Sequence, residues 1–183
     1  MCGIVGIAGR EAAAPISLPL LQAMNDRLRH RGPDAAGTFV AAGVGLGVRR
    51  LRIIDLQTGD QPIASEDGSV VVVCNGEIYN FVELRAELAA RGHGFRTRSD
   101  TEVIVHLYEE LGDRFLERLR GMFAIALWDG ARRRLLLARD RLGIKPLYYA
   151  ETADGLLFAS EQKAILEARD VPRELSPRAL DDL

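Results

Sequence analysis

A run of small and apolar residues directly behind Met1 constrains the fold of this chain more than any other segment. It reads Cys2-Gly3-Ile4-Val5-Gly6-Ile7-Ala8-Gly9. Branched aliphatic and small side chains in this density predict a buried strand, and the glycines predict that other backbone approaches it closely. The run lacks the basic segment before it and the small-residue cleavage site after it that a signal peptide requires. We therefore expect an ordered strand that starts at Cys2.

Cys2 carries candidate chemistry at the head of that strand. If Met1 is removed, Cys2 presents a thiol and a free α-amine on one backbone unit. An α-amine has an ordinary pKa of roughly 7.7 to 8.0, so near neutral pH a useful fraction can take the thiol proton, directly or through one water. The thiolate is the attacking species, and a terminal amine can replace a histidine as its base. Taken alone, however, Cys2 is better explained as a small residue that starts a strand.

Composition limits the classes of function. The 183 residues are 48% hydrophobic and 27% charged, which suits one well-buried globular domain. The 24 basic and 26 acidic residues give a net charge of −2, so electrostatics favour neither nucleic acid nor a membrane surface as a partner, and we expect a small ligand. No apolar run approaches the roughly 20 residues that span a bilayer. Cys2 and Cys74 form neither a metal-ligand spacing nor a disulfide framework, which predicts no metal site and a reduced, cytoplasmic setting.

Turn signals and apolar patterns predict strands on both sides of a helical centre. Short β-rich segments are expected at residues 37–41, 44–50, 70–74, 122–128, 135–139, 147–150 and 156–160. Asp129-Gly130 and Asp154-Gly155 predict hairpins, and hairpins imply antiparallel pairing. These elements predict an α+β domain in which helices cover the outer faces of two stacked antiparallel sheets.

Two residue pairs predict how the central helices begin. Asn80 and Glu83 stand three positions apart, the spacing of a capping box, before a helix that is expected to end near residue 91. Ser99 and Glu102 repeat this pattern before a second helix with an apolar stripe. Further helices are expected at residues 17–30 and 161–167.

Six short strings occur along the chain in one order. They are Met1-Cys2-Gly3-Ile4-Val5-Gly6, Arg29-His30-Arg31-Gly32-Pro33-Asp34, Arg50-Leu51 with Ile53-Ile54-Asp55, Asn75-Gly76-Glu77-Ile78-Tyr79-Asn80, Ser99-Asp100-Thr101-Glu102, and Ala138-Arg139-Asp140-Arg141-Leu142-Gly143-Ile144-Lys145-Pro146-Leu147. Together they resemble the glutaminase domain of glutamine-hydrolysing asparagine synthetases, a class II glutamine amidotransferase within the N-terminal-nucleophile hydrolases. The resemblance covers essentially the whole chain. It implies a four-layer αββα sandwich of two antiparallel sheets flanked by helices.

The resemblance also implies a reaction. The Cys2 thiolate would attack the side-chain amide of glutamine, pass through a tetrahedral oxyanion to a thioester with release of ammonia, and be freed by water with release of glutamate. The Asn75 side chain and the Gly76 backbone N–H would form the oxyanion hole, because glycine permits unusual dihedral angles and close approach. The alternative for Asn75-Gly76 is a plain hairpin turn after the strand at 70–74.

The remaining implied site residues would hold the substrate. Arg50 would grip the α-carboxylate of glutamine through two hydrogen bonds, and Asp100 would hold the α-ammonium. Glu77 and the backbone of Ile53 and Ile54 would line the same pocket. The alternatives are a solvated charge at a strand end for Arg50 and a favourable interaction with a helix dipole for Asp100.

One string departs from the family pattern, which usually begins with histidine; here it reads Val48-Arg49-Arg50-Leu51-Arg52-Ile53. Val48 has no polar group, so a supporting hydrogen bond near the pocket is expected to be missing. His30, His93 and His106 are interpreted as structural, since the α-amine makes a histidine base unnecessary. Cys74 is interpreted as a small buried apolar residue.

Domain organisation follows from the same resemblance. Residues 1–170 are expected to form the amidotransferase domain, and residues 171–183 are expected to begin a linker to a synthetase domain. That second domain would bind ATP and Mg and activate aspartate, and its Ser-Gly-Gly-x-Asp-Ser phosphate loop does not occur in this sequence. The domain at 1–170 is therefore expected to need no cofactor of its own.

The expected partners are glutamine and a synthetase domain in cis or in trans, with a homodimer as a further expectation. The ammonia would serve an asparagine-synthetase-like amidation of aspartate. Three alternatives stay open. The chain could be a glutamine-binding or partner-docking module that is inactive without its synthetase domain, an amidotransferase for another carboxylate acceptor, or an N-terminal-nucleophile hydrolase of a different amide.

Overall fold

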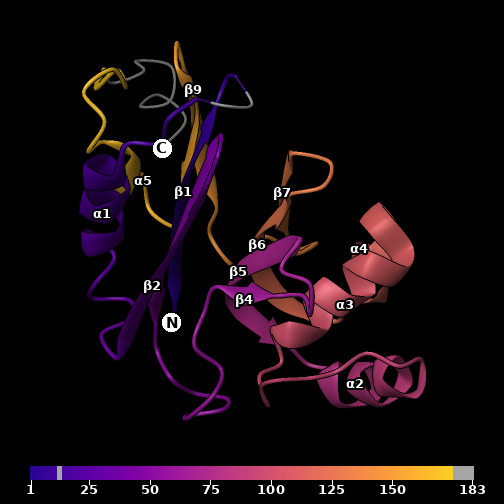
Figure 1. Ribbon diagram of the computed structural model, residues 1–183. Coiled ribbons are helices and arrows are strands. Elements are labelled where there is room, and N and C mark those ends of the chain that lie inside the picture. The colour runs from indigo at the N-terminus through magenta and orange to yellow at the C-terminus, as the bar shows by residue number, and fades with distance from the viewer. Residues whose placement is uncertain (12–13, 175–183) are drawn as a thin grey trace.

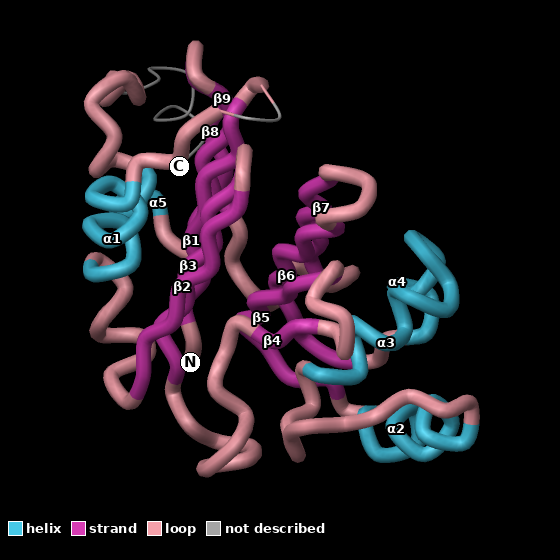
Figure 2. The backbone as a smooth tube through the Cα atoms, viewed as in Figure 1, coloured by secondary structure: helices cyan, strands magenta, loops and turns pink. Residues whose placement is uncertain are grey.

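Two antiparallel sheets face each other, and helices cover the outer face of each, so the chain forms four layers (Figures 1 and 2). This computed structural model describes residues 1–11 and 14–174. The predicted α+β αββα sandwich is confirmed. Of the predicted linker at 171–183, residues 175–183 lie outside the described residues.

The five-stranded sheet is built around the N-terminal strand. The strand order is β2-β3-β1-β9-β8, with bounds Ala35–Ala41 for β2, Val44–Arg50 for β3, Gly3–Gly9 for β1, Gly155–Ala159 for β9 and Tyr148–Thr152 for β8. β1 pairs with a neighbour on each side, in a register that places Gly3 opposite Arg49 and Val5 opposite Ala159. Ile4 and Val5 are fully buried. Cys2, directly before β1, therefore lies at the centre of the sheet end.

The four-stranded sheet has the order β4-β5-β6-β7, with bounds Ile63–Ala64, Val70–Ile78, Gly121–Asp129 and Arg134–Arg139. β5 runs four residues beyond the predicted end at 74, because β6 pairs with its whole length. Asn75 and Gly76 are opposite Ala124 and Phe123 inside this ladder. The hairpin-turn interpretation of Asn75-Gly76 is therefore wrong, as is their expected position after the strand.

Helices close both outer faces. α1 (Leu18–Asp26) and α5 (Gln162–Ile165) cover the five-stranded sheet, whereas α2 (Phe81–Ala90), α3 (Glu102–Leu111) and α4 (Phe115–Arg118) cover the four-stranded sheet (Figure 1). A short 3-10 helix, Gly112–Arg114, joins α3 to α4. Leu21 and Met24 of α1, with Leu28 just after it, pack against the five-stranded sheet. A separate apolar core that includes Ile4, Val48 and Val73 fills the space between the sheets.

The helix starts differ from the predicted capping boxes. The Asn80 side chain caps no backbone N–H of α2; it accepts from Arg120 N and donates to Arg118 O, which ties the start of α2 to the segment before β6. The Glu102 carboxylate accepts from the N–H groups of Arg96 and Thr97 instead of reaching back to Ser99. In both cases a tertiary contact uses the side chain that the local motif would have needed.

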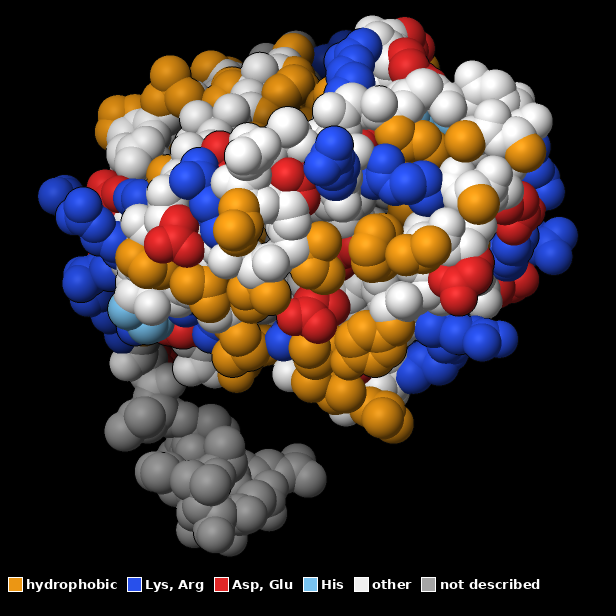
Figure 3. All heavy atoms as spheres, turned by 90° about the horizontal axis from the view of Figure 1, so that it is seen from below, with side chains coloured by type: hydrophobic (Ala, Val, Ile, Leu, Met, Phe, Trp, Pro, Cys, Tyr) orange, Lys and Arg blue, Asp and Glu red, His pale blue; other side chains and the backbone are white. Residues whose placement is uncertain are grey.

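The outer surface mixes charges of both signs with apolar groups. Figure 3 shows this on the face seen from below Figure 1, where Lys and Arg side chains alternate with Asp, Glu and hydrophobic side chains. Among the helices within residues 1–11 and 14–174, none combines the length and the apolar character needed to cross a bilayer.

Candidate active site

One small pocket brings together all eight residues that the sequence analysis assigned to a site. It lies where β1 begins, where β3 ends and along the outer part of β5, and it encloses about 50 Å³. The eight come from four separate segments of the chain: Cys2, Arg50, Ile53, Ile54, Asn75, Gly76, Glu77 and Asp100. Met1, Leu51, Gln61, Ser99, Thr101 and Lys145 complete the lining.

Cys2 is held from both its side chain and its backbone. The Leu51 backbone N–H donates to Cys2 Sγ across 3.4 Å, and Cys2 Sγ lies 3.7 Å from the Leu51 carbonyl oxygen. Arg31 Nε donates to the Cys2 carbonyl oxygen across 2.9 Å. The half-buried thiol thus occupies a fixed position in the pocket wall.

Glu161 supports this arrangement from the turn before α5. Its carboxylate accepts a hydrogen bond from Arg31 Nη1 across 2.9 Å, and it also contacts His30 and Lys163. Partial burial raises the pKa of the Glu161 carboxyl, but the hydrogen bonds from Arg31, Lys163 and His30 outweigh that effect and lower it to about 2. Glu161 is therefore an anion at neutral pH that orients the arginine bound to Cys2.

Asn75 offers an unpaired amide to the pocket. Its side chain is only 1% exposed, yet neither Nδ2 nor Oδ1 has a hydrogen-bond partner among the described residues. Burying an amide without a partner is costly, so such a group in a pocket wall is suited to binding a ligand. The amide N–H is the kind of donor that an oxyanion requires.

The edge of β5 offers a second donor. β4 covers β5 only as far as Val72, and beyond it side chains satisfy this edge: Gln61 accepts from Cys74 N across 2.6 Å, and Asp100 accepts from Ile78 N across 2.8 Å. Alternation along a strand points the N–H of Gly76, midway between these two, to the same edge. Glycine is required at this position because a Cβ would lie 2.2 Å from the Met122 carbonyl oxygen of β6, not because of unusual dihedral angles.

Arg50 is buried in the site, so its interpretation as a solvated strand-end charge is wrong. It is 4% exposed; Nη1 donates to Asp60 across 2.6 Å, and Nη2 donates to the Ile54 and Asp55 carbonyl oxygens. The Arg50 guanidinium, which was expected to bind the α-carboxylate of glutamine, thus binds the carboxylate of Asp60. The neighbouring Arg49 points the opposite way and donates to the carbonyl oxygen of Asn25 in α1.

Asp100 places a buried carboxylate beside β5. Burial raises the pKa of Asp100 most strongly, and the nearby charge of Glu77 raises it further, against the lowering effect of the Ile78 hydrogen bond. α3 begins at Glu102 with Thr101 as its N-cap residue, so the Asp100 side chain serves β5 rather than the helix N-terminus. A buried carboxylate of this kind is suited to an ammonium ligand.

Six lining residues were not predicted as site residues, Lys145 and Gln61 among them. Lys145 is 5% exposed, its Nζ lies 3.2 Å from Met1 Sδ, and its backbone N–H is held by the Asp140 carboxylate. Lys145 stands inside one of the six strings, so the motif could have indicated it. Gln61, which bonds the backbone of Cys74 through both ends of its amide, follows a loop without a local signal.

The other residues discussed from the sequence, Val48, the three histidines and Cys74, lie outside the pocket lining. Val48 is fully buried in the core between the sheets and does not line the pocket, so the departure from the family pattern alters packing there. His30 contacts Glu161, while His93 and His106 lie together near α3. Cys74 is 2% exposed, and burial raises the pKa of its thiol well above the ordinary value.

Comparison with known proteins agrees with this geometry. An asparagine synthetase [glutamine-hydrolyzing] 2 of Bacillus subtilis is 47% identical over 188 residues, covering 100% of this chain and 25% of that protein. The enzyme with the same description from Oryza sativa is 46% identical over 166 residues, covering 90% of this chain and 28% of that protein. The chain therefore spans about a quarter of the length of these relatives.

Solved structures support the fold. The glutamine phosphoribosylpyrophosphate amidotransferase of B. subtilis, complexed with ADP and GMP, superposes with a TM-score of 0.72 at 25% identity, over 90% of this chain and 43% of that one. A family model described as glutamine amidotransferase domain matches residues 1–183. The chain therefore belongs to the glutamine amidotransferase domain family.

Proposed function

We propose that this chain hydrolyses glutamine to glutamate and ammonia through a thioester on Cys2. The observation that carries the proposal is the convergence of all eight predicted residues on one pocket, with the buried Asn75 amide lacking a partner among the described residues. A pocket with a candidate nucleophile, unpaired donors and a buried carboxylate is the arrangement expected for acyl transfer.

Activation of the nucleophile requires the α-amine of Cys2. After loss of Met1, the neutral amine accepts the thiol proton, and the thiolate attacks the Cδ carbon of glutamine. The carbonyl oxygen becomes an oxyanion that accepts hydrogen bonds from Asn75 Nδ2 and the Gly76 N–H. The ammonium of Cys2 then returns a proton to the amide nitrogen, the C–N bond breaks, and ammonia leaves a glutamyl thioester.

Hydrolysis completes the cycle. A water molecule gives up a proton to the same α-amine and attacks the thioester carbon, again through an oxyanion. The C–S bond breaks, the thiolate is reprotonated, and glutamate leaves. The contact of Arg31 with the Cys2 carbonyl oxygen supports this cycle, because it keeps the amine and the sulfur in one orientation through both steps.

Recognition of the α-amino acid group falls to two buried charges. Asp100 accepts the α-ammonium, and Arg50 binds the α-carboxylate in competition with Asp60, which already contacts both Arg50 and Arg52. Because Asp60 is half exposed, it can turn to water when a substrate carboxylate takes its place. Glu77, Ile53 and Ile54 complete the wall.

The size of the pocket supports removal of Met1. Ligand pockets usually enclose roughly 300 to 1,000 Å³, whereas this one encloses about 50 Å³ and has Met1 in its lining. Met1 also contacts the buried ammonium of Lys145. Loss of Met1 enlarges the pocket, and it leaves Lys145 facing the space where the substrate would lie.

The use of the ammonia follows from the relatives. They are described as glutamine-hydrolysing asparagine synthetases, and three quarters of their length lies outside the region that this chain matches. We therefore infer that a synthetase domain, in cis or in trans, uses the ammonia to amidate aspartate with ATP and Mg.

Steady-state release of glutamate tests the proposal. Protein with a free Cys2 should hydrolyse glutamine, whereas the Cys2→Ala variant and protein that retains Met1 should not. An amide without an α-amino acid group should compete poorly with glutamine, because it cannot use Arg50 and Asp100. Hydrolysis that survives Cys2→Ala would exclude the mechanism, and equal turnover of the simple amide would exclude the substrate.

A further inference from the structure

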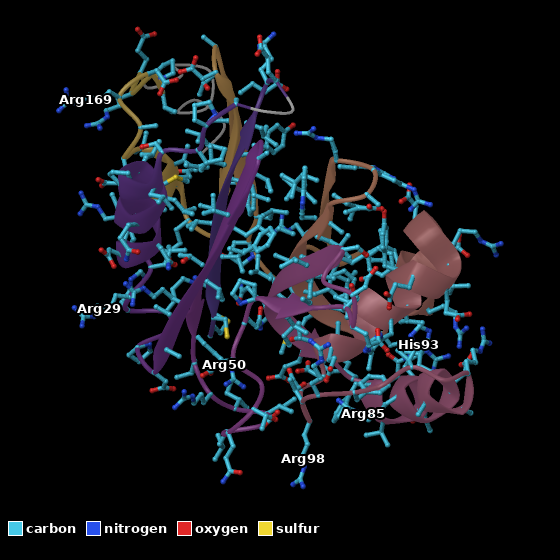
Figure 4. The ribbon with its side chains drawn as sticks, viewed as in Figure 1. Arg29, Arg50, Arg85, His93, Arg98 and Arg169 are labelled. Carbon is cyan, nitrogen blue, oxygen red and sulfur yellow. The ribbon has the colours of Figure 1, made fainter. Side chains whose placement is uncertain are left out.

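Four side chains at the helix-covered outer face of the four-stranded sheet point their potential metal-binding atoms toward one another. Their donor atoms all lie within 4.8 Å of one another, and they come from the β4–β5 turn, the α2–α3 loop and α3: Glu66, His93, His106 and Glu109. Figure 4 labels His93 beside α2 and α3, away from Arg50 at the candidate active site. We propose that these four residues bind one zinc ion. The proposal is independent of glutamine hydrolysis.

Four donor-to-donor distances lie close to the edge length of a tetrahedral zinc site. Zinc binds imidazole nitrogen and carboxylate oxygen at roughly 2.0 to 2.2 Å, so neighbouring donors in a tetrahedral site lie roughly 3.3 to 3.5 Å apart. His106 Nδ1 lies 3.1 Å from Glu109 Oε2 and 3.4 Å from Glu66 Oε2. His93 Nδ1 lies 3.6 Å from Glu109 Oε2 and 3.9 Å from Glu66 Oε1. Three of these four distances exceed ordinary hydrogen-bond length, so the groups surround a point more than they bond one another.

The ring nitrogen of His93 that is not a proposed ligand, Nε2, already contacts Glu110. His93 Nε2 lies 3.1 Å from Glu110 Oε1, so the other ring nitrogen, Nδ1, is the one directed at the carboxylates of Glu66 and Glu109. A ring that donates Nε2–H to Glu110 offers the lone pair of Nδ1 to a cation between these carboxylates. A metal-binding histidine commonly donates its second N–H to a carboxylate in this way.

His106 is the buried ligand of the group. It is 1% exposed, its Nε2 has no hydrogen-bond partner among the described residues, and the ring meets the edge of Phe95 at a centroid distance of 4.6 Å. Its Nδ1 is directed at the carboxylates of Glu66 and Glu109, which places a buried imidazole nitrogen where a metal ion would lie. His106 and Glu109 are three residues apart on α3, so they share a helix face.

The donor set selects the metal and its role. Two imidazole nitrogens favour zinc over magnesium and calcium, which prefer oxygen ligands. Four protein ligands fill the tetrahedron, so the ion would be structural rather than catalytic. The ion would cross-link the β4–β5 turn to α3. The Gly94 N–H already orients the Glu66 carboxylate, across 2.8 Å, and Glu66 and Glu109 are exposed enough for the ion to enter from solvent.

Titration of the chelator-treated full chain with zinc alone tests the proposal by calorimetry. Cys2→Ala serves as the background, because it removes a thiol that could bind zinc elsewhere. We expect one ion per chain, a higher melting temperature with zinc, and the intense visible absorption of tetrahedral Co²⁺ when cobalt replaces zinc. His93→Gln and Glu109→Gln should each abolish stoichiometric binding. Glu110→Gln, which removes the carboxylate that contacts both His93 and Arg91, should weaken affinity about 10- to 100-fold.

His30→Gln is the matched control, since His30 also faces a carboxylate but stands apart from the four ligands. It should bind zinc like the background protein. Circular dichroism and thermal unfolding of the metal-free variants establish that each one folds. Failure of the background protein to bind zinc, binding that persists in folded His93→Gln or Glu109→Gln, or an octahedral cobalt spectrum would each overturn the proposal.

Discussion

Arg31 joins Cys2 to Glu161: its Nε donates to the Cys2 carbonyl oxygen and its Nη1 donates to Glu161, each across 2.9 Å. The three residues come from the start of β1, from the loop after α1 and from the turn before α5. The contact therefore fixes Cys2 against two distant parts of the chain.

Replacing Glu161 should destabilise the fold in a pH-dependent way. The pKa of Glu161 is about 2 in the folded chain against an ordinary 4.5, so the stability that its ionised form contributes is complete above pH 4.5 and is lost as pH falls through 2. Glu161→Gln should lower the free energy of unfolding by about 1.5 to 3 kcal/mol at pH 7. Urea unfolding from pH 7 down to 2 should show the difference from wild type shrinking, and a constant difference would contradict this account. Glu117→Gln, which breaks an exposed pair with Arg114, should change little.

Removing the Asn75 amide should slow the chemical step. Asn75→Ala should reduce kcat by about 10² to 10³, equivalent to roughly 2.7 to 4 kcal/mol, while KM for glutamine changes little, because the oxyanion forms only during reaction. Glutamate release measured over a range of glutamine concentrations separates the two constants. Asn80→Ala removes an amide outside the pocket and should leave kcat unchanged. A large rise in KM at constant kcat in Asn75→Ala would assign Asn75 to substrate binding alone.

Adding a methyl group at position 76 should damage the sheet. In Gly76→Ala the new Cβ would lie 2.2 Å from the Met122 carbonyl oxygen, so β5 and β6 must separate, at a cost of about 1 to 3 kcal/mol. Denaturant unfolding measures that loss, and activity should fall with it because the Gly76 N–H is displaced. Gly94→Ala is the control, since its Cβ meets only the Glu66 carboxylate at 3.8 Å. Equal stability of the two variants would show that the β5–β6 contact is looser than described.

Glutamine binding should weaken on acidification because of Asp100. Burial raises the pKa of this carboxyl, and the substrate ammonium favours its ionised form, so affinity should fall as pH drops through the raised pKa. In that range, binding should release a proton. Calorimetry on unreactive Cys2→Ala protein in buffers of different ionisation enthalpy detects both effects. Asp100→Asn should bind weakly at every pH, and a normal pH dependence in that variant would remove Asp100 from the ammonium site.

Much of the fold was predictable because local patterns and tertiary structure agree in the sheets. The strand at 44–50 has the predicted bounds, and the Asp129-Gly130 and Asp154-Gly155 pairs stand at the ends of the hairpins β6–β7 and β8–β9. Branched apolar residues in these strands are buried on both faces of the sheet, so the apolar pattern of the sequence predicts the buried strands directly. The helix starts were not predictable in the same way, because Asn80 and Glu102 bond groups far from their own helix termini.

The composition of the pocket was predictable only through the six strings taken together. No local signal distinguishes Asn75-Gly76 in a strand from the same pair in a hairpin; the pairing of β5 with β6 decides it. Gln61 and the partner of Arg50, Asp60, come from an irregular loop without periodicity. The convergence of His93 and His106 with Glu66 likewise depends on how the β4–β5 turn meets α3, which sequence spacing does not record.

The central claim is that the Cys2 sulfur becomes acylated by glutamine while its own α-amine serves as the base. Intact-mass analysis of active protein, quenched in acid soon after mixing with glutamine, tests it most directly. We predict a chain that lacks Met1 and carries the added mass of one glutamyl group, lost on treatment with hydroxylamine and missing from Cys2→Ala. Turnover of glutamine by protein whose N-terminus is blocked, or without any such adduct on Cys2, would contradict it.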